Sequence, residues 1–308
     1  MNIVLLYHSI YSEIPSVRKN FHSVSFENFK KQIEFLNRNY SLDYIDNLIG
    51  SKNKKGAYIT FDDGYRDLSN KAIPFLENQK IPYTIFWNPG FGQNGFWRDK
   101  LRLIISKPYL SKILIKKLNE KYKNYNFNIS NVYVKTKGNQ INNKLVADIC
   151  DEILSKNGIR IDCQIMNFKE IYELCKQTNY LRIGNHSLSH FNLTSLNNNE
   201  LDEELGRSKE LISKLPKSKI SNIFSIPFGG TKDIDSNILW QITKKYDYKG
   251  ILMSRNMLNL NQLLFKKIIF ENNIIERFMP KDEGSEEFKK QIKKIMFKTL
   301  VKKAISYT

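Results

Sequence analysis

The sequence has few cysteines, few histidines and no apolar run of membrane length. Its 308 residues include only three cysteines, Cys150, Cys163 and Cys175, which lie far apart and form no CxxC pair. This spacing excludes a cysteine metal motif, and an odd number argues against a disulfide framework. We therefore expect reduced, partly buried thiols.

The N-terminal segment MNIVLLYHSI lacks the basic start and the cleavage site of a secretory signal. Its apolar run is too short for a signal peptide or a membrane span. Residues 2–7 instead show the continuous Ile, Val and Leu pattern of a buried parallel strand. From these features we expect a cytoplasmic protein.

Acidic residues are in the minority, with 31 Asp and Glu against 49 Lys and Arg, which gives a formal net charge of +18. Such a charge favours an anionic partner, either a phosphate-bearing substrate, an acidic membrane surface or nucleic acid. A compositional bias toward Lys, Asn and Ile explains the charge equally well. Because the chain has no recognisable nucleic-acid-binding module, we expect no nucleic-acid partner.

Apolar segments of strand length alternate with amphipathic helical segments along most of the chain. Residues 26–39 have apolar side chains at helical spacing, and Ser25 is placed to cap that helix. Residues 56–63 (GAYITFDD) and 82–87 (PYTIFW) are typical of buried strands. This order predicts a parallel sheet or barrel whose functional residues lie at the carboxyl ends of the strands.

Two regions depart from this alternation. Residues 100–165 are first helical and basic and then polar and irregular, which we interpret as an insertion that forms a lid or docking surface.

The main domain is then expected over residues 1–285, followed by a basic amphipathic helix over residues 286–308. That helix can lie on an anionic membrane or pack its apolar stripe on the barrel, and the sequence leaves both open. The stripe consists of Phe288, Ile292, Met296, Leu300 and Ala304.

Two of the four histidines, His186 and His190, lie four residues apart in the segment IGNHSLSH. A second motif, Asp62-Asp63-Gly64, closes the strand GAYITFDDG. Adjacent carboxylates on an extended segment point in different directions, so one can bind a cation while the other transfers protons. Two imidazoles and one carboxylate are a recurrent ligand set for catalytic zinc and for other first-row metals. Together the motifs favour a hydrolase for an amide or an ester.

The motifs TFDDG, HSLSH and PFGG, in this order, resemble those of polysaccharide deacetylases of the NodB-homology type, carbohydrate esterase family four. The resemblance covers most of residues 1–255 and is less clear across 100–165. It implies a distorted (β/α)7 barrel and the metal-dependent removal of an N- or O-acetyl group from a sugar.

The resemblance also assigns roles to individual residues. Asp62 corresponds to the catalytic base. The expected ligands of a divalent metal, most simply Zn²⁺, are Asp63, His186 and His190. Pro227, Phe228 and Gly229 correspond to the motif that lines the substrate groove. Apart from the resemblance, we expect Tyr65, Trp87 and Arg98 to bind the substrate, the two aromatic residues by stacking on a sugar ring.

The sequence departs from the family pattern at two places. Ser225 stands where the family commonly has an arginine that orients the base, and we expect Arg66 or Arg98 to substitute for it. No histidine follows His190, so the usual general acid is missing. His8 closes the first strand, and a branch that deacetylates biofilm exopolysaccharides has a similar start, so we expect His8 to be the acid.

The sequence therefore predicts a metal-dependent enzyme that removes an acyl group, most simply N-acetyl, from an amino sugar carrying a nucleotide- or lipid-linked diphosphate. The basic C-terminal helix adds the option of peripheral membrane contact. Two other hypotheses remain, namely a deformylase or amidase for another small amide and a non-catalytic sugar-binding relative.

Overall fold

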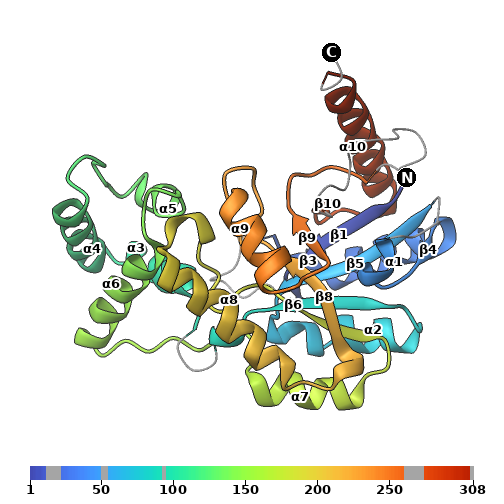
Figure 1. The fold of residues 1–308 in the computed structure, drawn as a ribbon, viewed down its shortest axis with the longest axis horizontal. Helices are drawn as coiled ribbons and strands as arrows, with labels where there is room; N and C mark the ends of the chain where they lie inside the picture. The colour runs from blue at the N-terminus through green and yellow to red at the C-terminus, as the bar shows by residue number, and fades with distance from the viewer. Residues whose placement is uncertain (12–21, 50–54, 92–94, 260–273, 306–308) are drawn as a thin grey trace.

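The computed structural model describes residues 1–11, 22–49, 55–91, 95–259 and 274–305. Seven parallel strands form a nearly closed barrel with helices around it (Figure 1). In spatial order the strands are β1 (Ile3–Tyr7), β5 (Gly56–Asp63), β6 (Tyr83–Trp87), β7 (Leu181–Asn185), β8 (Ile220–Ser225), β9 (Gly250–Met253) and β10 (Ile274–Glu276).

The two ends of this sheet meet through one isolated parallel bridge, between Leu5 of β1 and Phe278 just after β10. A short strand, β4 (Ser41–Leu42), pairs with β5 outside the main path, and β2 (Ile10–Tyr11) pairs with β3 (Val24–Ser25) in a separate two-stranded sheet. The distorted (β/α)7 barrel implied by the sequence motifs is confirmed.

The barrel strands are mostly apolar because both faces of the sheet are covered. Every residue of β1, β5, β6 and β9 is buried. Strands that are buried on both faces have continuous rather than alternating apolar patterns. The run IVLLY at the N-terminus is therefore the first barrel strand, as predicted.

Two helix caps, of which the sequence analysis predicted the one at Ser25, begin helices on the outside of the barrel. Ser25 accepts a hydrogen bond from the backbone N–H of Asn28 at the start of α1 (Phe26–Asn39). Asn167 forms a reciprocal capping box with Glu170 in α7 (Phe168–Gln177). The remaining outer helices are α2 (Ala72–Asn78), α8 (Asn198–Ser213) and α9 (Ser236–Trp240), which continues into a π-helical turn at Gln241–Lys245.

The predicted insertion consists of four helices that lie to one side of the barrel (Figure 1). They are α3 (Trp97–Ile105), α4 (Pro108–Lys121), α5 (Val132–Lys135) and α6 (Asn143–Lys156). Their buried side chains, such as Leu101 and Val146, belong to the same apolar cluster as the barrel strands. A short helix, α5, forms within the segment that the sequence suggested to be irregular.

The C-terminal helix α10 (Ser285–Ile305) packs on the barrel through its first half and on α1. Phe288 is fully buried between Phe35 and Phe278, at ring-centroid distances of 5.9 Å to each. The predicted stripe divides, because Ile292 is buried whereas Met296 and Leu300 are exposed. Among the residues that the structure describes, no helix is long and apolar enough to cross a membrane.

Candidate active site and metal centre

The chemically active side chains lie at the carboxyl ends of the barrel strands, as they do in other parallel barrels. Asp62 and Asp63 are the last residues of β5, and His186 directly follows β7. His8 directly follows β1, and Arg277 directly follows β10. Five positions spread over 270 residues of sequence are thus brought to one end of one sheet.

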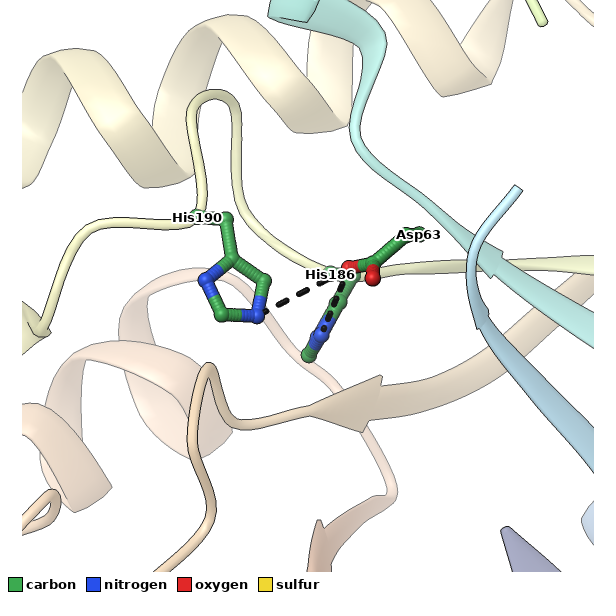
Figure 2. Close-up of side chains that lie close together, drawn as sticks. All are labelled: Asp63, His186 and His190. Carbon is green, nitrogen blue, oxygen red and sulfur yellow. Dashed lines mark ion pairs between the residues drawn. The ribbon is translucent and has the colours of Figure 1, made fainter. Parts of the chain in front are cut away.

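Asp63, His186 and His190 form a compact buried cluster whose possible ligand atoms all lie within 4.8 Å of one another. Oδ1 of Asp63 is 3.7 Å from Nε2 of each histidine (Figure 2). This oxygen is buried and has no hydrogen-bond partner among the residues that the structure describes. An orphaned buried carboxylate oxygen facing two imidazole nitrogens fits a divalent cation, which would supply the missing partner.

The histidine ring positions are fixed by contacts behind the cluster. Nδ1 of His186 lies 2.8 Å from the carbonyl oxygen of Ser225, so it donates its proton there and leaves the Nε2 lone pair facing Asp63. The His190 ring contacts the rings of Phe96 and Phe228 at centroid distances of 5.1 and 4.7 Å. Burial lowers the pKa of both imidazoles, which keeps them neutral and able to bind a cation.

Two residues of the cluster have left-handed backbone conformations, which direct their side chains into the site. Asp63 has φ +69° and His190 has φ +53°, a conformation that non-glycine residues seldom adopt. Gly64 continues the turn at φ +82°, where a Cβ atom would lie only 2.7 Å from Cδ1 of Trp87. The loop around His190 is further held by Glu204 of α8, which accepts a hydrogen bond of 2.8 Å from the backbone N–H of Ser189.

Asp62 lies beside the cluster, with Oδ2 at 3.5 Å from Nε2 of His186, and is held by a buried arginine that follows the last strand. Nη1 and Nη2 of Arg277 donate to the two carboxylate oxygens of Asp62 at 2.6 and 2.7 Å. Although burial alone would raise the pKa of Asp62, the Arg277 guanidinium holds it below its usual range. Nη2 of Arg277 also donates to the hydroxyls of Ser225 and Ser254, at 2.9 and 3.0 Å.

A cavity of about 400 Å³ opens over these side chains. Its lining includes the predicted residues His8, Asp62, Asp63, Tyr65, Arg98, His186, His190 and Phe228. It also includes residues that the sequence did not suggest, namely Leu6, His22, Phe96, Tyr133, Val134, Lys137, Ser254 and Met279. The barrel and the insertion therefore share one cavity.

Comparison with known proteins agrees with this architecture. The family model described as polysaccharide deacetylase matches residues 49–251, which is more than half of the chain. The chain belongs to the polysaccharide deacetylase family. No curated protein sequence matches this chain.

Solved structures match the deacetylase over nearly its whole length. The Streptococcus pyogenes deacetylase PplD, in complex with acetate, is 16% identical with a TM-score of 0.59, covering 96% of this chain and 97% of its own. A de-N-acetylase from Aggregatibacter actinomycetemcomitans is 14% identical with a TM-score of 0.57, covering 94% and 99%. IcaB from Ammonifex degensii is 14% identical with a TM-score of 0.53, covering 94% of each chain. At these identities the likeness shows the fold.

The arginine beside Asp62 of this deacetylase differs from the two that the sequence suggested. Arg66 pairs with Glu170 at 2.7 Å, and Arg98 donates to the Thr136 hydroxyl at 3.2 Å, so neither contacts Asp62. Arg277 takes that place, and the small side chain of Ser225 leaves room for its guanidinium. Residue 277 lies outside the segment that the family model matches, and only its position at a strand end could have indicated it.

His8 lines the deacetylase cavity beside the charged groups. Its Nδ1 is buried without a hydrogen-bond partner in the described structure, and its ring lies 5.6 Å from that of His22. Burial lowers the pKa of His8 to about 3, against an opposing effect of the Asp62 charge. The imidazole is therefore neutral before substrate binds.

Three predicted substrate-binding residues do not line the cavity. Trp87 is fully buried and donates its indole N–H to the Met166 carbonyl at 2.8 Å, so it supports the Gly64 turn instead of facing a sugar. Pro227 and Gly229 shape a turn, in which the Pro227 carbonyl accepts from the Gly229 N–H at 2.8 Å. Within that motif, Phe228 is the side chain that reaches the cavity.

Tyr65 lines the cavity, but it also hydrogen-bonds the carboxyl of Asp63. Because it is only 5% exposed, most of its ring packs in the core. The structure therefore gives Tyr65 a role in orienting a ligand of the metal centre, in addition to any contact with a substrate.

Proposed function

We propose that this protein is a metal-dependent deacetylase that hydrolyses the N-acetyl group of an amino sugar. The observation that carries the proposal is that two carboxylates in one cavity are held in different ways. Asp63 faces His186 and His190, whereas Asp62 is held by Arg277. One carboxylate is thus available for a cation and the other for proton transfer.

The cluster of Asp63, His186 and His190 would hold the cation, for which we propose Zn²⁺ because imidazole and carboxylate ligands suit it. Bound there, it would polarise the acetyl carbonyl and acidify the attacking water. His186 is kept in the required tautomer by the Ser225 carbonyl. Family membership and the orphaned Oδ1 of Asp63 support this assignment.

In this proposal Asp62 takes the proton of the attacking water. Its depressed pKa ensures that it is ionised, and its two hydrogen bonds from Arg277 set the direction of the carboxylate. The proton must then reach the nitrogen that leaves. We assign its delivery to His8, which lines the same cavity and has a ring nitrogen without a hydrogen-bond partner among the described residues. Because His8 is neutral in the free site, it would first accept the proton that Asp62 took from the water and then donate it to the leaving nitrogen. We propose on this basis that the protein belongs to the branch whose acid histidine lies near the N-terminus.

We further propose that the sugar carries a diphosphate, linked to a nucleotide or a lipid, and that the reaction takes place in the cytoplasm. The net charge of +18 favours an anionic substrate. Two cationic side chains, Arg98 and Lys137, line the cavity itself.

The experiment that tests the reaction uses the metal-loaded protein with a series of acyl amino sugars. Acetate release, with formyl and longer acyl groups tested in parallel, measures acyl preference. Asp62→Asn should bind metal as the wild type does and lose turnover by about 10²–10⁴-fold, the usual contribution of a general base. Unchanged turnover in this variant would contradict the role of Asp62, and preference for formyl would make the protein a deformylase.

A further inference from the structure

The wall of the cavity that belongs to the insertion is cationic. Arg98 comes from α3, and Lys137 follows α5. Arg98 is only 5% exposed, and its guanidinium carbon lies 3.8 Å from the ring centroid of Tyr133. In the described parts of the chain no carboxylate lies within ion-pair distance of Arg98, whose polar contacts are Thr136 and Tyr133.

A buried guanidinium without a carboxylate partner is unusual, because removing a charge from water is costly unless an opposite charge accompanies it. Burial accordingly lowers the pKa of Arg98, although an arginine side chain stays protonated in proteins. An anion in the cavity would supply the missing charge, and the planar guanidinium suits phosphate oxygens.

Lys137 lies close to the metal cluster. Its ammonium lies 4.7 Å from the ring centroid of Phe228, and the same ring contacts His190 at 4.7 Å. One aromatic ring thus separates this cation from a metal ligand. Burial lowers the pKa of His22, and the charge of Lys137 lowers it further. The same charge opposes the rise that burial causes in the pKa of Asp233, which accepts hydrogen bonds from Gly230 and Asn192.

We propose that Arg98 and Lys137 form a subsite for the anomeric phosphate of the amino-sugar substrate. In a sugar of this kind the acetamido group and the anomeric phosphate are on neighbouring ring carbons. A cation one aromatic ring from the metal cluster matches that spacing. The inference rests on the proposed function only for the identity of the sugar that carries the phosphate.

The test compares three forms of one N-acetyl amino sugar, namely a neutral glycoside, an anomeric phosphate and a nucleotide-diphosphate derivative. Lys137→Gln should lower kcat/KM for both phosphorylated forms by about tenfold, the loss of one charge-assisted hydrogen bond, and leave the neutral glycoside within about twofold. Lys112→Gln is the matched control, because Lys112 is exposed on α4 and outside the cavity. Equal losses on all three forms, or equal effects of the two variants, would overturn the proposal.

Binding of inorganic pyrophosphate tests the subsite without a measurement of turnover. Inorganic pyrophosphate should bind the metal-loaded wild type and Lys112→Gln alike, and bind Lys137→Gln and Arg98→Gln about tenfold more weakly. Lys137 is exposed, so its variant remains informative if Arg98→Gln does not fold. Weaker pyrophosphate binding without any deacetylation would retain the subsite and reject the proposed reaction. Equal binding by all four proteins would reject the subsite.

A different observation concerns the second half of α10. Its apolar side chains Phe297, Leu300 and Val301 are 69%, 45% and 40% exposed. Lysines surround them, at positions 293, 294, 298 and 302, and the acidic residues of the helix lie in its first turn. Figure 1 shows that this end of α10 extends away from the barrel.

We infer that this face of α10, defined by Phe297, Leu300, Val301 and the neighbouring lysines, docks on an anionic lipid surface. Apolar side chains flanked by lysines bind such a surface by combining burial with electrostatic attraction. A second copy of the chain is disfavoured as the occupant. A symmetric contact through this face would place lysine against lysine.

Sedimentation with vesicles tests this inference. The protein should bind phosphatidylglycerol vesicles at low salt and bind pure phosphatidylcholine vesicles at least tenfold more weakly. The double variant F297S/L300S should lose at least tenfold of that binding, whereas Tyr109→Ser, at an equally exposed aromatic on α4, should lose none. Equal binding by the double variant, or a dimer that the double variant abolishes, would overturn the inference.

Discussion

Arg277 and Asp62 are 215 residues apart in sequence, and their side chains form a bidentate ion pair that is almost completely buried. Arg277 is fully buried, and its Nη2 also contacts the hydroxyl of Ser225. The position where relatives commonly have an arginine therefore holds a small acceptor for an arginine that arrives from another strand. The carboxylate that we propose as the base is thus held by an arginine from a different strand than the family motif suggests.

The contact between Arg277 and Ser225 predicts the effect of exchanging these two residues. Arg277→Ser should leave Asp62 buried without a counter-charge, which raises its pKa, lowers the free energy of unfolding by about 3–5 kcal/mol and lowers deacetylation about 100-fold. Adding Ser225→Arg to that variant should restore part of both losses. Thermal unfolding and initial rates measure the two effects.

Arg277→Lys is the control, because it retains the charge and loses the two parallel hydrogen bonds. It should be more stable than Arg277→Ser and less active than the wild type. If Arg277→Ser were as active as the wild type, Arg277 would have no part in positioning the base.

The fold could be predicted from the sequence because its signals are local. Buried strands such as IVLLY have continuous apolar runs, and the caps at Ser25 and Asn167 follow from two or three neighbouring residues. The candidate metal cluster could also be predicted from local signals, since His186 and His190 are four residues apart and Asp63 closes a recognisable strand.

Arg277 could not be predicted, because its role depends on closure of the barrel. Only the position of β10, the seventh strand, brings Arg277 beside Asp62 on β5. For Trp87, in contrast, the sequence predicted a substrate contact that the structure does not show. Composition suggests an aromatic that stacks on a sugar, whereas the close approach of Gly64 requires that ring in the core.

The role of His8 can be separated from that of Asp62 by the leaving group. His8→Phe should lower hydrolysis of an N-acetyl sugar by about 10²-fold or more, because the amine must be protonated as it leaves. It should have little effect on 4-nitrophenyl acetate, whose leaving group needs no proton. Asp62→Asn should impair both substrates. Equal losses on both substrates in His8→Phe would make His8 a structural residue.

Metal removal should destabilise the protein as well as inactivate it. Oδ1 of Asp63 is buried without a hydrogen-bond partner among the described residues, and burial raises the pKa of this carboxyl, so the metal-free cluster is left without a favourable charge interaction. A cation at 100 times its dissociation constant would stabilise the fold by about 2.7 kcal/mol. Thermal unfolding with chelator, and again after Zn²⁺ is restored, measures this difference.

Asp63→Asn should abolish that response and bind no metal by elemental analysis. Asp62→Asn is the matched control, since it lies beside the cluster and should retain about one ion per chain. A chelator that leaves the melting temperature unchanged would argue that these residues hold no resident cation.

The buried carboxyl of Glu204 predicts how stability depends on pH. Burial raises its pKa from 4.5 to about 7, although hydrogen bonds from Ser189 and Ser187 oppose the shift. The folded state therefore binds a proton more tightly than the unfolded state. Its contribution to stability is fully present below pH 4.5 and is lost as pH rises toward and through 7.

Glu204→Gln cannot ionise and should remove this dependence. The variant should resemble the wild type in stability near pH 4.5 and exceed it above pH 7, by up to about 3 kcal/mol from the linkage relation. Glu203→Gln, on the same helix and half-exposed, is the control and should leave the profile unchanged. Denaturant unfolding between pH 4.5 and 8.5 measures the three profiles, and parallel profiles for Glu204→Gln and the wild type would show that Glu204 keeps an ordinary pKa.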